Sequence, residues 1–213
     1  MTKADKSDAL KAVVKAESGE QPQECAKPRV RDRIFDTACD LFYRQGIRSV
    51  GVDTIASEAG TNKMSFYRNF PSKDDLISEY LQKEADEFLK WWDETTAPHA
   101  GNPRRQIEAL FEAQIQRILH QNCHGCAFMN AAVELRDTEH PATQIIYSNK
   151  AELLRRMRKL AKEAGARTPD QLADALALIA SGNLMTRVSY APDQWPGTQS
   201  LKIVKRLLQV YID

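Results

Sequence analysis

Apolar residues recur every three or four positions along most of the chain, and glycines and prolines divide this pattern into separate segments. Such spacing places apolar side chains on one face of a helix. No segment alternates apolar and polar residues between turn signals, as a half-buried strand would. The chain of 213 residues is therefore predicted to be all-α.

Nine helices are expected from this periodicity together with glycine stops, proline starts and capping residues. Ser72, followed three residues later by Asp75, resembles a capping box at the start of the fourth helix. The approximate limits of the nine are 29–45, 52–59, 62–69, 73–97, 104–121, 127–136, 141–165, 169–191 and 198–212.

Composition and charge narrow the class of protein. A hydrophobic share of 42% and a charged share of 28% are typical of a soluble globular chain. The formal net charge is +1, so any DNA site must be a local basic patch. The N-terminus has no apolar signal core, and no run approaches the roughly 18 apolar residues of a membrane span. We expect a cytoplasmic protein with no membrane partner and with free thiols, and a disordered or weakly helical tail over residues 1–28.

Residues 52–70 read VDTIASEAGTNKMSFYRNF and predict two short helices joined by a tight turn at Gly60. Ala56 and Gly60 are small enough for the close helix contact that a helix-turn-helix requires. The second helix would expose polar and aromatic side chains that can meet phosphates and base edges in a major groove. Between Thr61 and Lys73 the chain has no acid but carries three positive charges, on Lys63, Arg68 and Lys73.

Residues 29–80 resemble the N-terminal DNA-binding domain of TetR-family regulators. The matching positions are Ala38, Leu41, Phe42 and Gly46 in the first helix, Thr54, Ile55, Ala56, Ala59 and Gly60 in the second, and Tyr67, Phe70, Ser72, Lys73 and Leu76 beyond it. The resemblance implies a helix-turn-helix domain over residues 29–75 and a ligand-binding and dimerisation domain over residues 76–213. The second of these matches the family only in being helical and of suitable length.

The resemblance also implies which residues contact DNA. We expect the recognition helix to use Asn62, Lys63, Met64, Ser65, Tyr67 and Arg68, the start of the preceding helix to approach the backbone through Val52, Asp53 and Thr54, and Lys73 to hold a phosphate. Two positions depart from the family: Gly51 stands where threonine is usual, and Met64 where a small residue is common. Met64 could contact a thymine methyl group or change the half-site preference. Phe70 is expected in the core.

Large apolar residues of the second domain lie on helices that must face each other. The resemblance implies a pocket for a small molecule, whose binding moves the helix matching residues 73–93 and separates the DNA-binding heads. A plain packed core is the alternative for each lining residue. The residues assigned to the pocket are Phe88, Trp91, Trp92, Phe111, Ile115, Phe128 and Met129.

The segment Cys123-His124-Gly125-Cys126 could bind a metal or form a redox disulfide, with His120 and His140 as further candidate ligands. Ordinary packing at a helix junction is the competing interpretation, because an isolated pair of this spacing is a weak motif. No cofactor or metal is therefore assigned. The chain lacks a glycine-rich phosphate loop, paired catalytic carboxylates and a Ser-His-Asp spacing, so it is not expected to be an enzyme.

Two apolar stripes are interpreted as a dimer seam. The spacing suits helix–helix packing across a two-fold axis, which predicts a homodimer on a palindromic operator in double-stranded DNA. Packing against the chain's own core is the alternative. The stripes are Leu172, Leu176, Ile179 and Asn183 in one helix and Leu201, Val204, Leu208 and Tyr211 in the other.

Together these features predict a ligand-responsive DNA-binding regulator. The resemblance implies a repressor that a small molecule releases from its operator. The alternative function is a regulator that senses a metal or the thiol redox state through Cys123 and Cys126.

Overall fold

The computed structural model describes residues 28–120 and 123–213, so the predicted tail lies outside the described part apart from Pro28. Within these two ranges all regular structure is helical, which confirms the all-α prediction. The α-helices are α1 (Val30–Gln45), α2 (Val52–Glu58), α3 (Lys63–Asn69), α4 (Lys73–Thr96), α5 (Pro103–His120), α6 (Ala127–Leu135), α7 (Pro141–Glu163), α8 (Pro169–Arg187) and α9 (Ser200–Ile212). Two short 3-10 helices cover Ala97–His99 and Pro196–Gln199.

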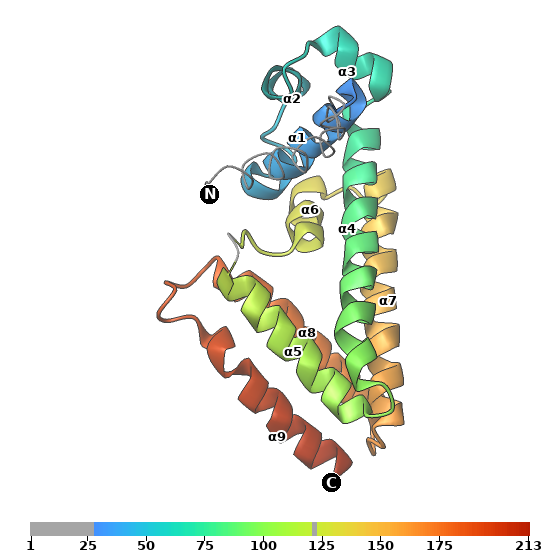
Figure 1. Ribbon diagram of the computed structural model, residues 1–213, viewed down its shortest axis with the longest axis vertical. Coiled ribbons are helices and arrows are strands. Elements are labelled where there is room, and N and C mark those ends of the chain that lie inside the picture. Colours follow the sequence, from blue (N-terminus) through green and yellow to red (C-terminus); the bar gives the residue numbers. More distant parts are fainter. Residues whose placement is uncertain (1–27, 121–122) are drawn as a thin grey trace, which may run out of the picture.

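Helices α1, α2 and α3 form a small head above the rest of the molecule (Figure 1). Ile34, Ile55 and Phe66 are completely buried between the three helices. Burying each such side chain stabilises the head by about 1.5–3 kcal/mol relative to exposure. Phe70 is also buried, as the sequence predicted.

The turn between α2 and α3 depends on Gly60, which adopts a φ of +64°. The backbone N–H of Thr61 bonds to the oxygen of Ala56 at 2.8 Å, and that of Gly60 bonds to Ser57 at 3.0 Å. This pair of bonds is a Schellman ending, which favours glycine at the left-handed position. The turn thereby sets the angle at which α3 leaves α2.

Helix α4 is shared between the head and the body. Its first turns bury Leu76, Tyr80 and Leu81 in the core of the head, whereas Trp92 lies in the core of the body. The helix runs without a break through the predicted domain boundary after residue 75. One helix therefore contributes to the core of the head and to that of the body.

Helices α5, α7, α8 and α9 form the body, with α7 alongside α4 and with α6 between the head and the body (Figure 1). The body packs its own apolar core around Ile107, Met157, Leu172 and Val204.

The two stripes interpreted as a dimer seam face this core instead. Leu172, Leu176, Asn183, Val204 and Leu208 are buried within the single chain. Ile179, Leu201 and Tyr211 are partly buried and pack against the same core. The interpretation as the seam was wrong for the five buried residues, because a stripe of this spacing can face either the chain's own helices or a second copy. A different set of apolar residues is exposed on α8 and α9: Leu178 (74% exposed), Ile203 (51%) and Val210 (53%).

No helix in the described ranges is long and apolar enough to cross a membrane.

Candidate DNA interface and ligand cavity

Helix α3 presents one exposed face. Lys63, Met64, Tyr67 and Arg68 form a shallow surface together, and Met64 and Tyr67 are 65% and 50% exposed. Phe66, on the opposite side of the helix, is completely buried and anchors it. The face therefore combines two cations with a thioether and a phenol, which suits contact with phosphates and base edges.

Two predicted contact residues also build α3. The side-chain oxygen of Asn62 accepts a hydrogen bond from the Ser65 N–H at 2.9 Å, which makes Asn62 the N-cap. The backbone oxygen of Ser65 accepts from the amide of Asn69 at 2.7 Å. Loss of such a cap costs about 1 kcal/mol, so substitution of Asn62 would perturb the helix as well as any DNA contact.

Lys63 and Asp53 form an ion pair at 3.0 Å that links α3 to the first turn of α2. The hydrogen bond to the Asp53 carboxylate raises the pKa of Lys63. Of the other residues predicted at the start of α2, Thr54 is exposed and Val52 is half-buried against the core of the head. The carboxylate of Asp53 repels phosphate, so its place here is to hold Lys63.

Lys73 lies in a different environment from the α3 cations. It is half-buried, with its ammonium 6.0 Å from the centre of the Phe42 ring. Burial lowers its pKa, while the nearby acids Asp74 and Glu134 act in the opposite direction. Ser72 caps α4 by accepting from the Asp75 N–H at 3.0 Å and donates to the Asp75 carboxylate at 2.7 Å, as the capping motif indicated.

A cavity of about 240 Å³ lies in the body beneath the head. Five residues predicted for a pocket line it, from α4, α5 and α6: Phe88, Trp91, Trp92, Phe111 and Phe128. The ring of Phe88 packs on those of Trp91 and Trp92, with centroids 5.9 and 6.0 Å apart.

The other two predicted pocket residues lie elsewhere. Ile115 packs in a separate cluster with Ile118 and Trp195. Met129 packs against the core of the head. Both residues lie on the apolar faces of their helices. Only part of each apolar face lines the cavity, and these two residues lie on the remaining part.

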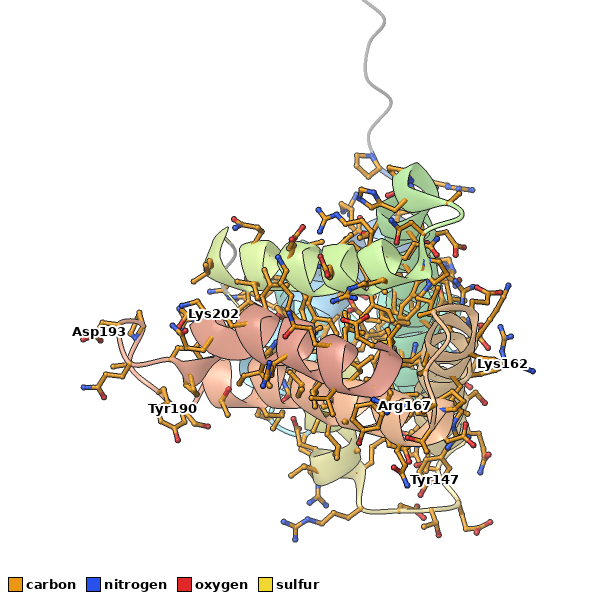
Figure 2. All side chains as sticks on the ribbon, turned by 90° about the horizontal axis from the view of Figure 1, so that it is seen from below. Tyr147, Lys162, Arg167, Tyr190, Asp193 and Lys202 are labelled. Carbon is orange, nitrogen blue, oxygen red and sulfur yellow. The ribbon has the colours of Figure 1, made fainter. Side chains whose placement is uncertain are left out.

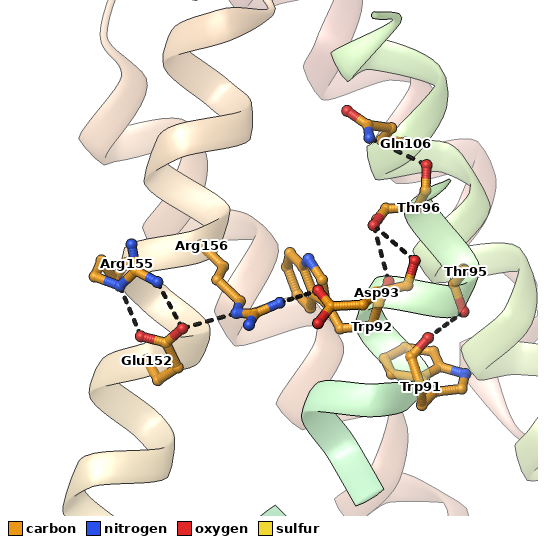
Figure 3. A network of polar contacts seen from close by, with 9 residues as sticks. All are labelled: Trp91, Trp92, Asp93, Thr95, Thr96, Gln106, Glu152, Arg155 and Arg156. Atoms are coloured by element: carbon orange, nitrogen blue, oxygen red, sulfur yellow. Dashed lines mark hydrogen bonds and ion pairs between the residues drawn. The ribbon is translucent and has the colours of Figure 1, made fainter. Parts of the chain in front are cut away.

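A polar network fixes α4 against α7 at the level of the tryptophans (Figure 3). Arg156 of α7 bonds to Asp93 of α4 and, at 2.7 Å, to Glu152. Hydrogen bonds from Arg155 and Arg156 lower the pKa of Glu152 to about 2. The amide of Gln106 on α5 donates to the backbone oxygen of Thr96 at 3.1 Å, so the end of α4 is tied to α5 as well.

The cavity wall also contains polar residues that the sequence analysis did not single out: Tyr43, Glu84, Glu87, Gln114, Arg117, Asn149, Lys150 and Ser181. Tyr43 comes from α1, in the head. Its hydroxyl donates to the backbone oxygen of Gly125 at 3.3 Å and accepts from the His124 N–H at 3.2 Å. The sequence signal that could have identified Asn149 and Lys150 is a polar dipeptide on a helix whose neighbouring inward positions, Ile146 and Leu153, are apolar.

The cysteine segment shows no ligand cluster in the part of the chain that the structure describes. No three His, Cys, Asp or Glu side chains gather there in a way that could hold a metal ion. Cys126 is buried and contacts the Lys150 ammonium at 3.8 Å. His140 caps α7 by accepting from the Ala142 N–H at 3.1 Å, and its Nε2 lies 3.3 Å from Asp74. The side chain of His120 lies outside the described residues.

A helix-turn-helix head joined by one continuous helix to a helical body with an internal cavity defines a class of DNA-binding transcriptional regulators. Residues 34–80 match the family model described as "Bacterial regulatory proteins, tetR family". The crystal structure of SCO4454, a TetR-family transcriptional regulator from Streptomyces coelicolor, has a TM-score of 0.81 and 26% identity, covering 86% of this chain and 96% of that one. Residues 34–80 therefore match the DNA-binding domain of the TetR family, and the chain as a whole is similar to a TetR-family transcriptional regulator.

Two curated relatives extend the comparison. The HTH-type transcriptional repressor KstR2 of Mycolicibacterium smegmatis is 27% identical over 110 residues, or 50% of this chain. The chain spans about half of that relative's length, 52%. The HTH-type transcriptional repressor DhaR of Mycobacterium sp. strain GP1 is 26% identical over 193 residues, covering 84% of this chain and 92% of the relative.

Proposed function

We propose that the protein is a homodimeric transcriptional repressor that binds a palindromic operator through α3 and leaves it when a small molecule occupies the cavity. The observation that supports this most directly is that the cavity wall and the DNA-binding head have two helices, α1 and α4, in common. Tyr43 of α1 and Phe88 of α4 both line the cavity, and both helices are also part of the head.

Helix α6 provides a second connection between the cavity and the head. Its first residues, Ala127 and Phe128, line the cavity. Near its other end, Glu134 accepts a hydrogen bond from the backbone N–H of Arg48 at 2.7 Å, in the loop before α2. A ligand that displaces α6 or α4 therefore changes the position of α2 and α3, and with it the spacing of the two recognition helices in a dimer.

On DNA, we assign base and phosphate contacts to Lys63, Met64, Tyr67 and Arg68, and phosphate affinity to Lys73. Asn62, Ser65, Val52, Asp53 and Thr54 complete the proposed interface, with Asn62 also serving as the cap of α3 and Asp53 as the partner of Lys63. Met64 lies between the cations and offers an apolar surface for a thymine methyl group.

We assign dimerisation to the exposed face of α8 and α9. These helices lie side by side at one end of the molecule, and the loop that carries Tyr190 and Asp193 projects beyond them (Figure 2). Leu178, Ile203 and Val210 stand exposed on this face. Exposed apolar residues on two adjacent helices favour a protein–protein contact, and a two-fold dimer presents its recognition helices to two half-sites.

Selection from a random DNA pool at a fixed, stated salt concentration tests the proposal, because salt sets the affinity of phosphate contacts. Enrichment of a two-fold symmetric site is expected. Lys63→Ala should weaken binding to that site, whereas Lys159→Ala, on the exposed surface of α7, should not. Failure to enrich any sequence with protein that has been unfolded and refolded to remove bound small molecules would contradict the proposal.

A further inference from the structure

The cavity has an aromatic wall and a polar end, and the polar end is built from two neighbouring residues of α7. Phe88, Trp91 and Phe111 form part of the aromatic wall. Asn149 and Lys150 line the same cavity. Pockets of this composition bind molecules that have an apolar body and a polar group of matching chemistry.

Asn149 is only 8% exposed and lines the cavity, and its amide makes no hydrogen bond to another residue in the described ranges. The amide atoms are not fully enclosed by protein, because the enclosed polar atoms without a partner belong to His124, His140 and Arg187. An amide with free donors and a free acceptor in a cavity wall can bond to what enters the cavity. By contrast, Gln114, also on the wall, is paired: its amide donates to the Ala180 oxygen at 3.1 Å and its oxygen accepts from Asn183 at 3.0 Å. Asn149 is thus a hydrogen-bonding group directed at the contents of the cavity.

Lys150 supplies a positive charge beside this amide. It is half-buried, and its polar contact is the Cys126 sulfur at 3.8 Å. No carboxylate of the described chain lies within ion-pair distance of its ammonium. A half-buried cation without an anionic partner is stabilised by an anion that enters the site.

Two acids, Glu84 and Glu87, and a second cation, Arg117, also line the cavity. Burial and the nearby Glu87 raise the pKa of Glu84, and Glu87 pairs with Lys83 at 3.6 Å. Neither acid forms an ion pair with Lys150, so the charge of Lys150 stays available to an anion in the cavity.

We propose that the cavity binds a small ring-bearing carboxylate, whose carboxylate accepts hydrogen bonds from Lys150 and Asn149 and whose ring packs on Phe88, Trp91 and Phe111. This inference rests on the proposed function, since it names the chemical class of the releasing ligand. A dry cavity of about 150 Å³ holds benzene. The 240 Å³ available here therefore suits a molecule of about ten non-hydrogen atoms.

Three probes have the same phenyl ring on a three-carbon chain and differ in the charge of the terminal group: phenylpropionate, phenylpropanol and phenylpropylamine. They test which charge the cavity prefers. Their affinities for the full chain are measured by isothermal titration calorimetry without DNA. The carboxylate should bind at least about tenfold more tightly than the alcohol and the amine, because it alone carries a negative charge that pairs with the Lys150 ammonium.

Lys150→Met should lower the affinity for phenylpropionate to that for phenylpropanol, and Asn149→Ala should lower it several-fold. Phenylpropanol carries no charge and reports whether the cavity of each variant is intact. Lys159→Met is the matched control, because Lys159 lies on the same helix but is exposed and pairs with Glu163 at 3.8 Å. Equal affinity for the three probes, a preference for the amine, no binding of any probe, or a preference that survives Lys150→Met would each overturn the inference.

A separate measurement distinguishes a failure of the ligand-class inference from a failure of the proposed function. The selected operator, labelled with a fluorophore, is titrated with protein in the presence and absence of saturating phenylpropionate. Release of DNA supports both statements. Preferential binding of the carboxylate without release supports the ligand class and contradicts ligand-responsive repression.

Discussion

The hydroxyl of Tyr43 in α1 donates a hydrogen bond to the backbone oxygen of Gly125, 82 residues along the chain and just before α6. The imidazole of His124 packs edge-on against the Tyr43 ring, with centroids 5.5 Å apart. Because Tyr43 also lines the cavity, one side chain contacts the cavity, the start of α6 and the helix that supports the DNA-binding head.

Tyr43→Phe keeps the ring but removes both hydrogen bonds of the hydroxyl. The free energy of unfolding should fall by about 1 kcal/mol, the usual net value for such a loss. The ratio of DNA affinities without and with ligand should move towards one, because α6 and the head are less tightly connected. Urea unfolding and fluorescent DNA titration measure the two effects. Tyr147→Phe is the control, since Tyr147 is exposed on α7 (Figure 2); an equal loss of ligand response there would count against the connection.

The helices could be predicted because their signals are local. Gly60 ends α2, Ser72 caps α4 and Pro141 begins α7, and none of these depends on a distant partner. The direction of each apolar face could not be predicted in the same way. Leu176 sits on a stripe that suits either the chain's own core or a second copy, and only the packing of α8 against α7 and α9 decides between them.

The same limit applies to predicting from the sequence which residues line the cavity. Trp92 and Ile115 are both apolar residues at inward positions, yet the first lines the cavity and the second packs beside Trp195. The choice depends on helix crossings between residues far apart in sequence. Lys150 could not be assigned for the same reason, because its lack of a carboxylate partner appears only when α6 and α7 are placed together.

The ion pair between Lys63 and Asp53 predicts opposite effects of two substitutions on DNA affinity. Lys63→Ala should weaken operator binding at least about fivefold and reduce the slope of log affinity against log salt by about 1, since one phosphate or base contact is lost. Asp53→Asn should strengthen binding at low salt, because it frees Lys63 and removes a negative charge from the DNA-facing surface. Electrophoretic mobility shift at several salt concentrations measures both. Weaker binding of the Asp53→Asn protein would show that the carboxylate itself positions a DNA contact.

The exposed and buried residues of α8 should respond differently to substitution. Leu178→Glu places a charge on the exposed apolar face and should give monomers without unfolding the chain, as measured by sedimentation velocity. Val133→Glu is the matched control, because Val133 is 61% exposed on α6, away from this face. Leu176→Ala, at a completely buried position, should instead lower the free energy of unfolding by about 2–5 kcal/mol. A dimeric Leu178→Glu protein would remove the α8–α9 face from consideration.

Glu84 and Glu152 should give opposite pH dependences of stability. The pKa of Glu84 is raised above its ordinary value of 4.5, chiefly by burial. Its contribution to stability is therefore fully present below pH 4.5 and is lost as the pH rises through the higher pKa of the folded state. The pKa of Glu152 is lowered from 4.5 to about 2 by its arginine partners, so its contribution is present above pH 4.5 and is lost as the pH falls towards 2.

Glu84→Gln should thus be more stable than the wild-type protein at neutral pH, with the advantage disappearing towards pH 4, because glutamine has no carboxyl to be ionised in a buried site. Glu152→Gln should be less stable at neutral pH, with the deficit disappearing in acid. Chemical denaturation of both variants and of the wild-type protein across this range provides the comparison. A Glu84→Gln protein that is less stable than the wild type at neutral pH would show that the carboxylate at position 84 has a stabilising partner, and would weaken the argument that the inner cavity favours an anion.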